Sequence, residues 1–358
     1  MLSQRYRKLI KKVVFGETLL AQEFFIGLPE PQTEISVWLH GLGAPLDVTR
    51  CHSMACAAPF SICVAFDEGK KPRQTRWGGL TLKFCERSGG QKVLGEIGLK
   101  LVTSISAVGF ELCFFEARSS ANHCLPMLRL YAHYLLHAYS DRRISSGTSG
   151  MKMSFLEKRA AMVNFIRPHP TVLVSLSWEN RGNIFPMNLM GDLGPGYFGF
   201  ALKDSRKAAH LVEACGRIAV SSLPMPHAPL AYQLAVNHTK ECIEWNQLPF
   251  ATKPSPQFGI PVPVFAPRIR EMEVKKVHRI GSHTFFVAHI VSDESYSAAV
   301  QVLCVVHGFY QAWRLKGRSR ELQASVAENA ASKHGIYHPG THPVSAADAK
   351  TTHAGAPL

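Results

Sequence analysis

The chain has 358 residues, of which 46% are hydrophobic and 18% charged, and its formal net charge is +14. A chain of this length and apolar content can bury a core, which excludes a disordered tail protein, and at about 100–200 residues per domain we expect two domains. We expect no membrane span, because the sequence lacks a run of about 18 apolar residues. The positive charge fits nucleic acid, an anionic membrane surface or an anionic small molecule.

The amino-terminal segment is basic. The first twelve residues contain five Lys and Arg and no acid, and residues 13–25 are interrupted by polar side chains, so the clean apolar stretch of a secretory signal is missing. The nine cysteines are scattered and mostly lie in apolar runs, which is typical of buried thiols in a reducing compartment. We therefore expect a cytoplasmic protein.

Metal binding has little support. Cys51, His52 and Cys56 form a tight Cys/His group, but no second CxxC pair follows it, and we expect no metal site.

The clearest linker signal is the small, polar segment between Arg142 and Met153. It divides the chain into a β-rich amino-terminal domain over residues 1–150, whose role the sequence does not indicate, and a second domain over residues 155–325. Residues 330–358 are rich in Ala, Gly, Pro, Thr and His and are predicted to be a flexible tail.

Short apolar runs separated by turn signals predict strands in both domains. In the first domain we expect strands at 34–39, 59–66, 80–84, 95–102 and 109–116, and a helix at 125–138 that packs on them through Leu128, Tyr131 and Leu135. In the second we expect strands at 171–177, 196–202, 217–222, 262–266, 270–280, 284–291 and 302–306, with helices at 205–215 and 229–236. This pattern favours a barrel.

Two segments of the chain show the same order of features. Residues 35–66 and 171–202 each run from a strand through a polar turn and a small-residue stretch to a proline and a second strand. Two β-rich domains often look alike over such a length, so chance similarity is one interpretation. Duplication is the other, and duplicated halves could pack as a pseudo-symmetric pair.

The most informative segment runs from Tyr197 to Ser222. A strand leads directly into an amphipathic helix, for which we expect Asp204 or Ser205 as N-cap and Gly216 as the C-terminal stop. The first turn combines unpaired backbone N–H groups with Lys203, Ser205, Arg206 and Lys207. This combination suits a phosphate group, whereas the plainer interpretation is a solvated helix start.

The segment before this strand suits a flat ring. A hairpin leads into an irregular, Gly- and Pro-rich loop that offers backbone amides, the side chains of Asn183 and Asn188, and apolar walls from Phe185, Met187 and Leu189. A planar heterocycle with a phosphate tail could bridge this loop and the helix start.

At this point the sequence resembles a known family. Pro168–Ser175, the turn at Gly182-Asn183, the proline-containing loop, Lys203-Asp204-Ser205 with its helix, and Arg279–Val287 resemble the flavin reductase-like, FMN-binding split-barrel proteins. The resemblance covers residues 161–308, about half of the chain. It implies a mainly β fold with some helix: a split β-barrel in the carboxy-terminal half, preceded by a β-rich α+β amino-terminal domain.

The resemblance also implies a site. The FMN phosphate would be held by Lys203, Ser205 and Arg206, and the flavin ring by Asn183, Met187, Asn188 and Leu189. The family's Gly-Asp-His-Thr pattern appears here as Gly281-Ser282-His283-Thr284, which makes His283 the candidate catalytic residue, although a plain hairpin turn ending in a strand histidine explains it equally well. The sequence departs from the family at Phe185-Pro186-Met187, where small polar residues are usual.

Three functions remain open at this stage. The first is an FMN-binding oxidoreductase that passes hydride from NAD(P)H to flavin, with FAD or riboflavin as exchangeable alternatives to FMN. The second is a non-enzymatic split-barrel module that binds another ligand or regulates. The third is a nucleic-acid binder, which we do not expect because RNP-type, zinc-finger and helix-turn-helix patterns are all missing. The resemblance implies a homodimer, or a pseudo-dimer of the two halves of one chain.

Overall fold

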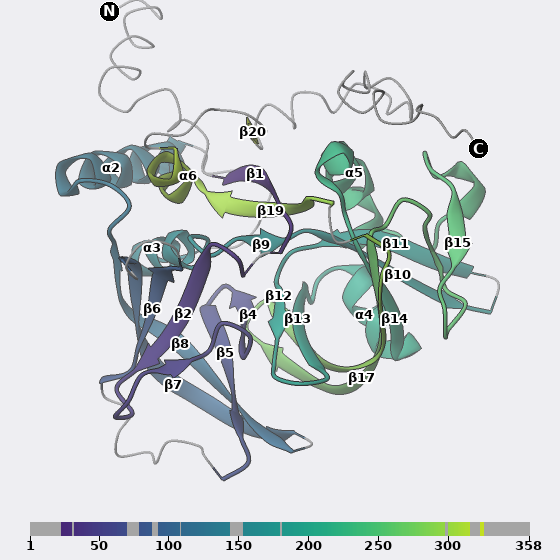
Figure 1. Ribbon diagram of the computed structural model, residues 1–358, viewed down its shortest axis with the longest axis horizontal. Coiled ribbons are helices and arrows are strands. Elements are labelled where there is room, and N and C mark those ends of the chain that lie inside the picture. Colours follow the sequence, from purple (N-terminus) through teal and green to yellow (C-terminus); the bar gives the residue numbers. More distant parts are fainter. Residues whose placement is uncertain are drawn as a thin grey trace, which may run out of the picture.

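The computed structural model describes residues 23–30, 32–69, 79–87, 92–107, 109–143, 153–179, 181–297, 300–315 and 323–325. Each half of the chain forms a seven-stranded sheet, and a four-stranded sheet lies across the two (Figure 1). The amino-terminal sheet is purple to blue in Figure 1 and the carboxy-terminal sheet is teal to green. The predicted fold class, mainly β with a split barrel in the carboxy-terminal half, is confirmed.

The carboxy-terminal sheet has the strand order β11-β10-β14-β17-β18-β13-β12, and every neighbouring pair is antiparallel. Side chains from all seven strands and from helix α4 share one buried core, so the sheet closes into a barrel around them. The strands are β10 (Val172–Trp178), β11 (Arg181–Met187), β12 (Met190–Asp192), β13 (Tyr197–Lys203), β14 (Arg217–Ser222), β17 (Arg268–Ile280) and β18 (His283–Ser295).

The amino-terminal sheet has the order β3-β2-β6-β7-β8-β5-β4 and is also antiparallel throughout. Its core includes side chains from helices α2, α3 and α6. The strands are β2 (Ile35–His40), β3 (Leu46–Asp47), β4 (His52–Ala57), β5 (Phe60–Asp67), β6 (Thr81–Glu86), β7 (Val93–Ala107) and β8 (Phe110–Asn122).

The four-stranded sheet, in the order β20-β1-β19-β9, joins distant parts of the chain. β1, near the amino terminus, pairs along its whole length with β19. A separate two-stranded sheet, β15-β16, lies beside the carboxy-terminal barrel. The strands are β1 (Glu23–Leu28), β9 (His169–Pro170), β15 (Thr252–Pro254), β16 (Pro261–Pro263), β19 (Val302–His307) and β20 (Gln323–Ser325).

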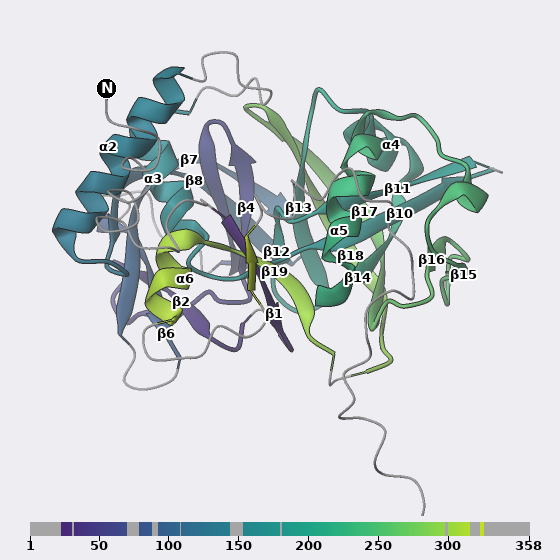
Figure 2. The same ribbon diagram turned by 90° about the horizontal axis from the view of Figure 1, so that it is seen from above.

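The helices cover the two halves unequally. Figure 2 shows α2, α3 and α6 gathered over the amino-terminal half and α4 and α5 beside the carboxy-terminal half. None of the described helices is long and apolar enough to cross a membrane. They are α2 (Met127–Arg143), α3 (Phe155–Asn164), α4 (Lys207–Cys215), α5 (Ala228–Gln233) and α6 (Gly308–Arg314), with 3-10 turns η3 (Met225–His227), η4 (Leu234–Thr239) and η5 (Trp245–Gln247).

The helix expected at 125–138 is present as α2, but its predicted packing face is wrong. Leu128 is 86% exposed, Leu135 is 72% exposed and Tyr131 is also exposed, whereas Leu130 and Tyr134 are buried against the amino-terminal core. The helix carries two apolar stripes. The stripe with Leu130 and Tyr134 packs on the core, whereas the spacing predicted that the other stripe would do so.

Three further expectations lie outside the described residues. They are the basic arm over residues 1–12, most of the linker between Arg142 and Met153, and the tail over residues 330–358.

The two seven-stranded sheets have the same topology. The seven strands β2 to β8, taken in chain order, occupy the same positions in their sheet as seven strands of the other half occupy in theirs. Those strands are, in the same order, β10, β11, β12, β13, β14, β17 and β18. The long hairpins match in register as well: from the turn outward, β7–β8 and β17–β18 each have five pairs, a bulge, three pairs, a second bulge and four pairs. A loop hydrogen bond is repeated too, from Ala65 N to Cys51 O at 2.8 Å and from Ala201 N to Leu189 O at 2.9 Å.

The halves meet through a shared apolar cluster. It contains side chains of β4, β5 and β8 on one side and of β13 and β18 on the other, with Phe114 and Phe285 in edge-to-face contact at 5.5 Å. Alternate residues of β5 and β13 face their own barrel, and the residues between them face the other half. These strands therefore read as nearly continuous apolar runs, because both of their faces are buried.

Candidate functional site

The junction of β13 and α4 carries the predicted phosphate-binding residues. β13 ends at Lys203 and α4 begins at Lys207; Ser205 is exposed and Arg206 is partly exposed between them. Arg206 is the N-cap and gives the helix no side-chain acceptor, and the Ala209 amide donates to the Arg206 carbonyl at 3.2 Å. The amides of Lys207 and Ala208 are then the first-turn donors that an anion could engage. Gly216 ends the helix in the left-handed conformation, with φ of +67°, as predicted.

The prediction that Asp204 or Ser205 caps this helix is wrong. The Asp204 carboxylate turns to the β17–β18 hairpin instead, where it accepts a hydrogen bond from the Thr284 hydroxyl of β18 at 2.7 Å and pairs with Arg279 of β17 at 3.7 Å. The local acid is thus engaged away from the helix start. The side chains of Lys203 and Arg206 give this end of the barrel a positive charge.

The predicted ring-binding loop lies beside the same strand. Asn188 and Leu189 connect β11 with β12, and the Leu189 carbonyl accepts the backbone N–H of Ala201, two residues before Lys203. The Leu189 side chain packs between the cluster shared by the two halves and the amino-terminal core. The structure therefore brings Asn188, Leu189 and the predicted phosphate-binding residues to one region of the barrel.

His283 belongs to this region as well. It faces Lys203 across the β13–β18 ladder. Its Nδ1 lies 2.9 Å from Ser282 Oγ and 3.5 Å from the Sγ of Cys56, a residue of the amino-terminal half. The side chain is only 4% exposed, and burial, with Lys203 adding to it, lowers the His283 pKa to about 4. The ring is neutral at pH 7. It can donate or accept a hydrogen bond, but it does not carry the second proton of an imidazolium and so cannot act as a general acid.

The other two residues predicted to contact the ring, Asn183 and Met187, make structural contacts instead. The Asn183 amide donates to the carbonyl oxygens of Asn237 and Lys240, both at 3.0 Å, and so ties β11 to η4. Met187 is 4% exposed and packs in the barrel core. Asn183 also lies four residues before Met187 along β11, about 13 Å away at 3.3 Å per residue.

The comparison with family models assigns this part of the chain. Residues 166–312 match the model of the flavin reductase like domain. These residues form a flavin reductase like domain. The resemblance seen in the sequence over residues 161–308 is thereby confirmed. No curated protein is significantly similar to the chain.

Several solved structures are similar to the chain. An FMN-binding protein from Thermus thermophilus, with bound 1-cyclohex-2-enone, is 24% identical, with a TM-score of 0.33 over 36% of this chain and 71% of that chain. An NADH:FAD oxidoreductase from Streptomyces globisporus is 16% identical, with a TM-score of 0.37 over 42% and 89%. The styrene monooxygenase flavin reductase from Pseudomonas putida is 20% identical, with a TM-score of 0.34 over 42% and 92%.

A cavity of about 750 Å³ lies at the other end of the flavin reductase like domain. Its wall includes Phe198 at the start of β13, five residues from Lys203, which is about 16 Å along a strand. None of the eight predicted site residues lines it. Residues of the amino-terminal half, among them Glu30, Arg50 and Cys51, close its other side.

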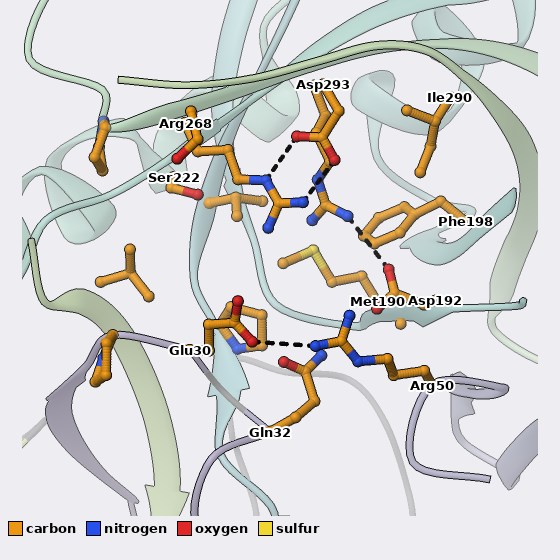
Figure 3. Close-up of a pocket in the computed structure, with 18 of the residues that line it drawn as sticks. Glu30, Gln32, Arg50, Met190, Asp192, Phe198, Ser222, Arg268, Ile290 and Asp293 are labelled. Carbon is orange, nitrogen blue, oxygen red and sulfur yellow. Dashed lines mark hydrogen bonds and ion pairs between the residues drawn. The ribbon is translucent and has the colours of Figure 1, made fainter. Parts of the chain in front are cut away.

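Charged side chains line this cavity in pairs. Three lining arginines each pair with a carboxylate of their own, and Figure 3 shows two of these pairs, Arg50 with Glu30 and Arg268 with Asp293. The three pairs are Arg50 with Glu30 at 3.1 Å, Arg270 with Asp192 at 3.3 Å and Arg268 with Asp293 at 2.6 Å. A fourth arginine, Arg167, also lines the wall.

Sequence reasoning missed this cavity. Its residues come from positions as distant as Pro29 and Val302, so no local motif announces it. One signal was partly available: Arg270 begins a predicted strand and Arg268 lies two residues before it, so that a strand extended to Arg268 puts both side chains on the same face. The flavin reductase like domain thus has a basic junction at one end of its barrel, which the sequence indicated, and an arginine-lined cavity at the other, which it did not.

Proposed function

We propose that this protein is a flavin-binding oxidoreductase that passes hydride from NAD(P)H to flavin. The observation that carries the proposal is the uncapped, basic start of α4 beside the β11–β12 loop, within a flavin reductase like domain. FMN is the expected flavin, and FAD or riboflavin are exchangeable alternatives.

The residues at the junction fit the phosphate of FMN. The Ser205 hydroxyl, the Arg206 guanidinium, the Lys203 ammonium and the first-turn amides of α4 supply donors and positive charge at one place. The backbone around Asn188 and Leu189 would orient the ring edge, and the flavin, when bound, supplies the hydride-accepting ring. Neutral His283 would offer a hydrogen bond there and hold the strand ends in place through Ser282 and Cys56.

The first test is binding. Titration of the purified protein with FMN, followed by quenching of flavin fluorescence, is expected to saturate, and the double variant Ser205→Ala, Arg206→Ala is expected to weaken binding at least tenfold, since hydrogen bonds to charged groups contribute about 1.5–3 kcal/mol each. Lys100→Ala, at an exposed position on β7, is the matched control and should leave the affinity unchanged. Equal FMN affinity in the double variant, or no binding by the unmodified chain, would refute the proposed site.

The second test is turnover. Oxidation of NADH or NADPH, followed by loss of absorbance with flavin present, is expected to depend on the protein. The alternative is a split-barrel module that binds flavin or another ligand without reduction. One observation favours it: Met187, in the segment where the family has small polar residues, is buried in the core. Saturable FMN binding without nicotinamide oxidation would support that alternative and contradict the oxidoreductase.

We further propose that residues 35–122 are a second copy of the barrel and occupy the place of a second subunit. The common strand order and the two matching bulges support this proposal. The chain is then a pseudo-dimer and should have the mass of one chain in solution. Light scattering coupled to size-exclusion chromatography tests it, and a stable dimer would favour the homodimer instead.

A cytoplasmic location completes the proposal, because none of the nine cysteines, all of which lie in the described residues, forms a disulfide. Fractionation of cells that express the full chain tests it. Recovery from an oxidising compartment would contradict it.

A further inference from the structure

We propose that the cavity between the two halves binds a small molecule with an oxyanion, either a carboxylate or a phosphate ester, and that Arg167 is its anchor. This proposal does not depend on flavin binding at the other end of the barrel. It rests on three observations: the buried, unsatisfied N–H donors of Arg167, the charges of the side chains that line the cavity, and the comparison of the two halves.

Arg167 is buried but unsatisfied. Its side chain is 2% exposed and lines the cavity, yet its Nε and Nη1 have no hydrogen-bond partner. A guanidinium has five N–H donors and is charged at all physiological pH values, so a buried one is normally held by a carboxylate or by several acceptors. An oxyanion in the cavity would supply the missing acceptors.

The wall offers Arg167 no carboxylate of its own, although the charge of Asp192 acts on it. Each of the three carboxylates that line the cavity, Glu30, Asp192 and Asp293, is already paired with another arginine. Within the described part of the chain, Arg167 is left as the one lining arginine without an ion pair. A monoanion near Arg167 would make the lining neutral.

Two buried histidines lie close enough to Arg167 to be affected by its charge. His52 and His169 are buried, and burial together with the charge of Arg167 lowers both pKa values, that of His169 to about 3. Both rings are therefore neutral, and His52 Nε2 is also without a partner. They add no negative charge beside Arg167.

The equivalent positions in the amino-terminal half contact protein rather than a cavity. Counting ladder pairs from the hairpin turns, Arg268 corresponds to Gly95 and Asp293 corresponds to Ser120. At Gly95 an added Cβ would lie 2.7 Å from Cγ1 of Val163 in helix α3, and Arg159 of the same helix donates to the Ser120 carbonyl at 2.7 Å.

Helix α3 thus fills the amino-terminal counterpart of the cavity. In the carboxy-terminal barrel the same place is a cavity, and arginines line it. The two halves therefore differ at this place: helix α3 occupies it in the amino-terminal half, and a charged cavity occupies it in the carboxy-terminal half.

The rest of the ligand is expected to be apolar and compact. Phe198, Met190 and Ile290 line the cavity beside the charged pairs (Figure 3), and Arg270 lies over the Phe198 ring at 4.4 Å. A small ring or short hydrocarbon would contact these walls while its anionic group meets Arg167.

Calorimetric titration with benzoate, phenyl phosphate and uncharged benzamide tests the proposal. At least one of the two anions is expected to bind tenfold or more tightly than benzamide, and the tighter anion identifies the carboxylate or the phosphate as the preferred group. Arg167→Met should abolish that preference. Arg217→Met, the same substitution at an exposed arginine of β14, should retain it.

Stability provides an independent readout. Because the described structure gives Arg167 no ion pair, Arg167→Met is expected to keep or raise the melting temperature in the absence of ligand, while the protecting effect of the bound anion on melting should disappear. Arg167→Lys, which keeps the charge, should retain part of the anion preference. The proposal is overturned if benzamide binds as tightly as both anions, if neither anion binds at millimolar concentration, or if Arg167→Met binds anions like the unmodified chain.

Discussion

Gly191 of β12 lies directly against the backbone of His52 of β4, so that a Cβ atom at position 191 would overlap the His52 carbonyl oxygen. The two residues belong to different halves of the chain, and their contact sets how closely the barrels approach. Nearby, Ser53 donates to the Gly199 carbonyl at 3.2 Å across the same boundary. The absence of a side chain at position 191 therefore has a steric cause in this structure.

Gly191→Ala is expected to destabilise the protein by about 1–3 kcal/mol, the usual cost of forcing an extra methyl group into a packed interior. Backbone, not a flexible side chain, stands in the way, so the two barrels must separate. Urea unfolding measures the change. Gly79→Ala, where nothing lies within 4 Å of the added Cβ, is the control, and an equal loss in both variants would contradict the steric argument.

The folded protein should lose stability in acid partly through His283. Its pKa is lowered by burial and by Lys203 from 6.5 to about 4. Because the folded value lies below the unfolded one, the unfolded chain binds more protons between pH 6.5 and 4, and stability falls as the pH falls through this window. Between pH 7 and pH 5 the contribution of this one group is about 2 kcal/mol.

His283→Gln should therefore flatten the pH dependence of unfolding by about that amount, although its stability at pH 7 will also change. Urea unfolding at the two pH values measures it. His123→Gln, at an exposed position, should keep the original slope. An unchanged slope in His283→Gln would mean that the ring is not held neutral by its surroundings.

One cysteine should react far faster than the others. Cys242 is exposed, Cys51 and Cys215 are partly buried, and the other six are buried. Burial raises the pKa of Cys51 and of Cys215, and nearby aspartates raise that of Cys51 further, which lowers their thiolate fractions.

Titration with a chromogenic disulfide at about pH 8 is expected to label one thiol quickly in the folded protein and all nine after denaturation. Cys242→Ser should remove the fast phase. Two or more fast thiols in the unmodified chain would show that the folded protein opens at Cys51 or Cys215.

The sequence predicts local structure well where one contiguous segment decides it. β14 has the predicted bounds, 217–222, and the β13–α4 junction lies where the strand-to-helix pattern put it. Helix α3 went unpredicted although Ser154 and Glu157 form a capping box in the structure and are visible as such in the sequence. Its buried residues Ala160, Met162 and Val163 pack in the core of the amino-terminal half, which no local pattern reveals.

Long-range assembly explains the remaining errors. Leu130 and Tyr134 face the core of the amino-terminal half because α6, from the far end of the chain, packs there with Phe309 and Tyr310. The N-cap expected of Asp204 is missing because Thr284, eighty residues later, takes its carboxylate. The cavity anchored by Arg167 is likewise an outcome of assembly.

The carboxylate of Glu34 joins two segments that are far apart in the sequence. It accepts the Tyr310 hydroxyl at 2.5 Å and two N–H groups of Arg314 at 2.8 and 2.9 Å, so it fixes α6 beside the start of β2. Tyr310 is almost fully buried, and burial and the carboxylate raise its pKa.

Glu34→Gln and Tyr310→Phe are each expected to cost about 1–3 kcal/mol of unfolding free energy, because a buried partner is left unsatisfied. The double variant should lose about 1 kcal/mol less than the sum, since one hydrogen bond is removed twice. Tyr296→Phe is the matched control: its hydroxyl binds the carboxylate of Glu294 at 2.8 Å at the surface, and its loss should stay within about 0.5 kcal/mol. Additive single effects, or a Tyr310→Phe cost no larger than that of the control, would show that α6 is held by packing alone.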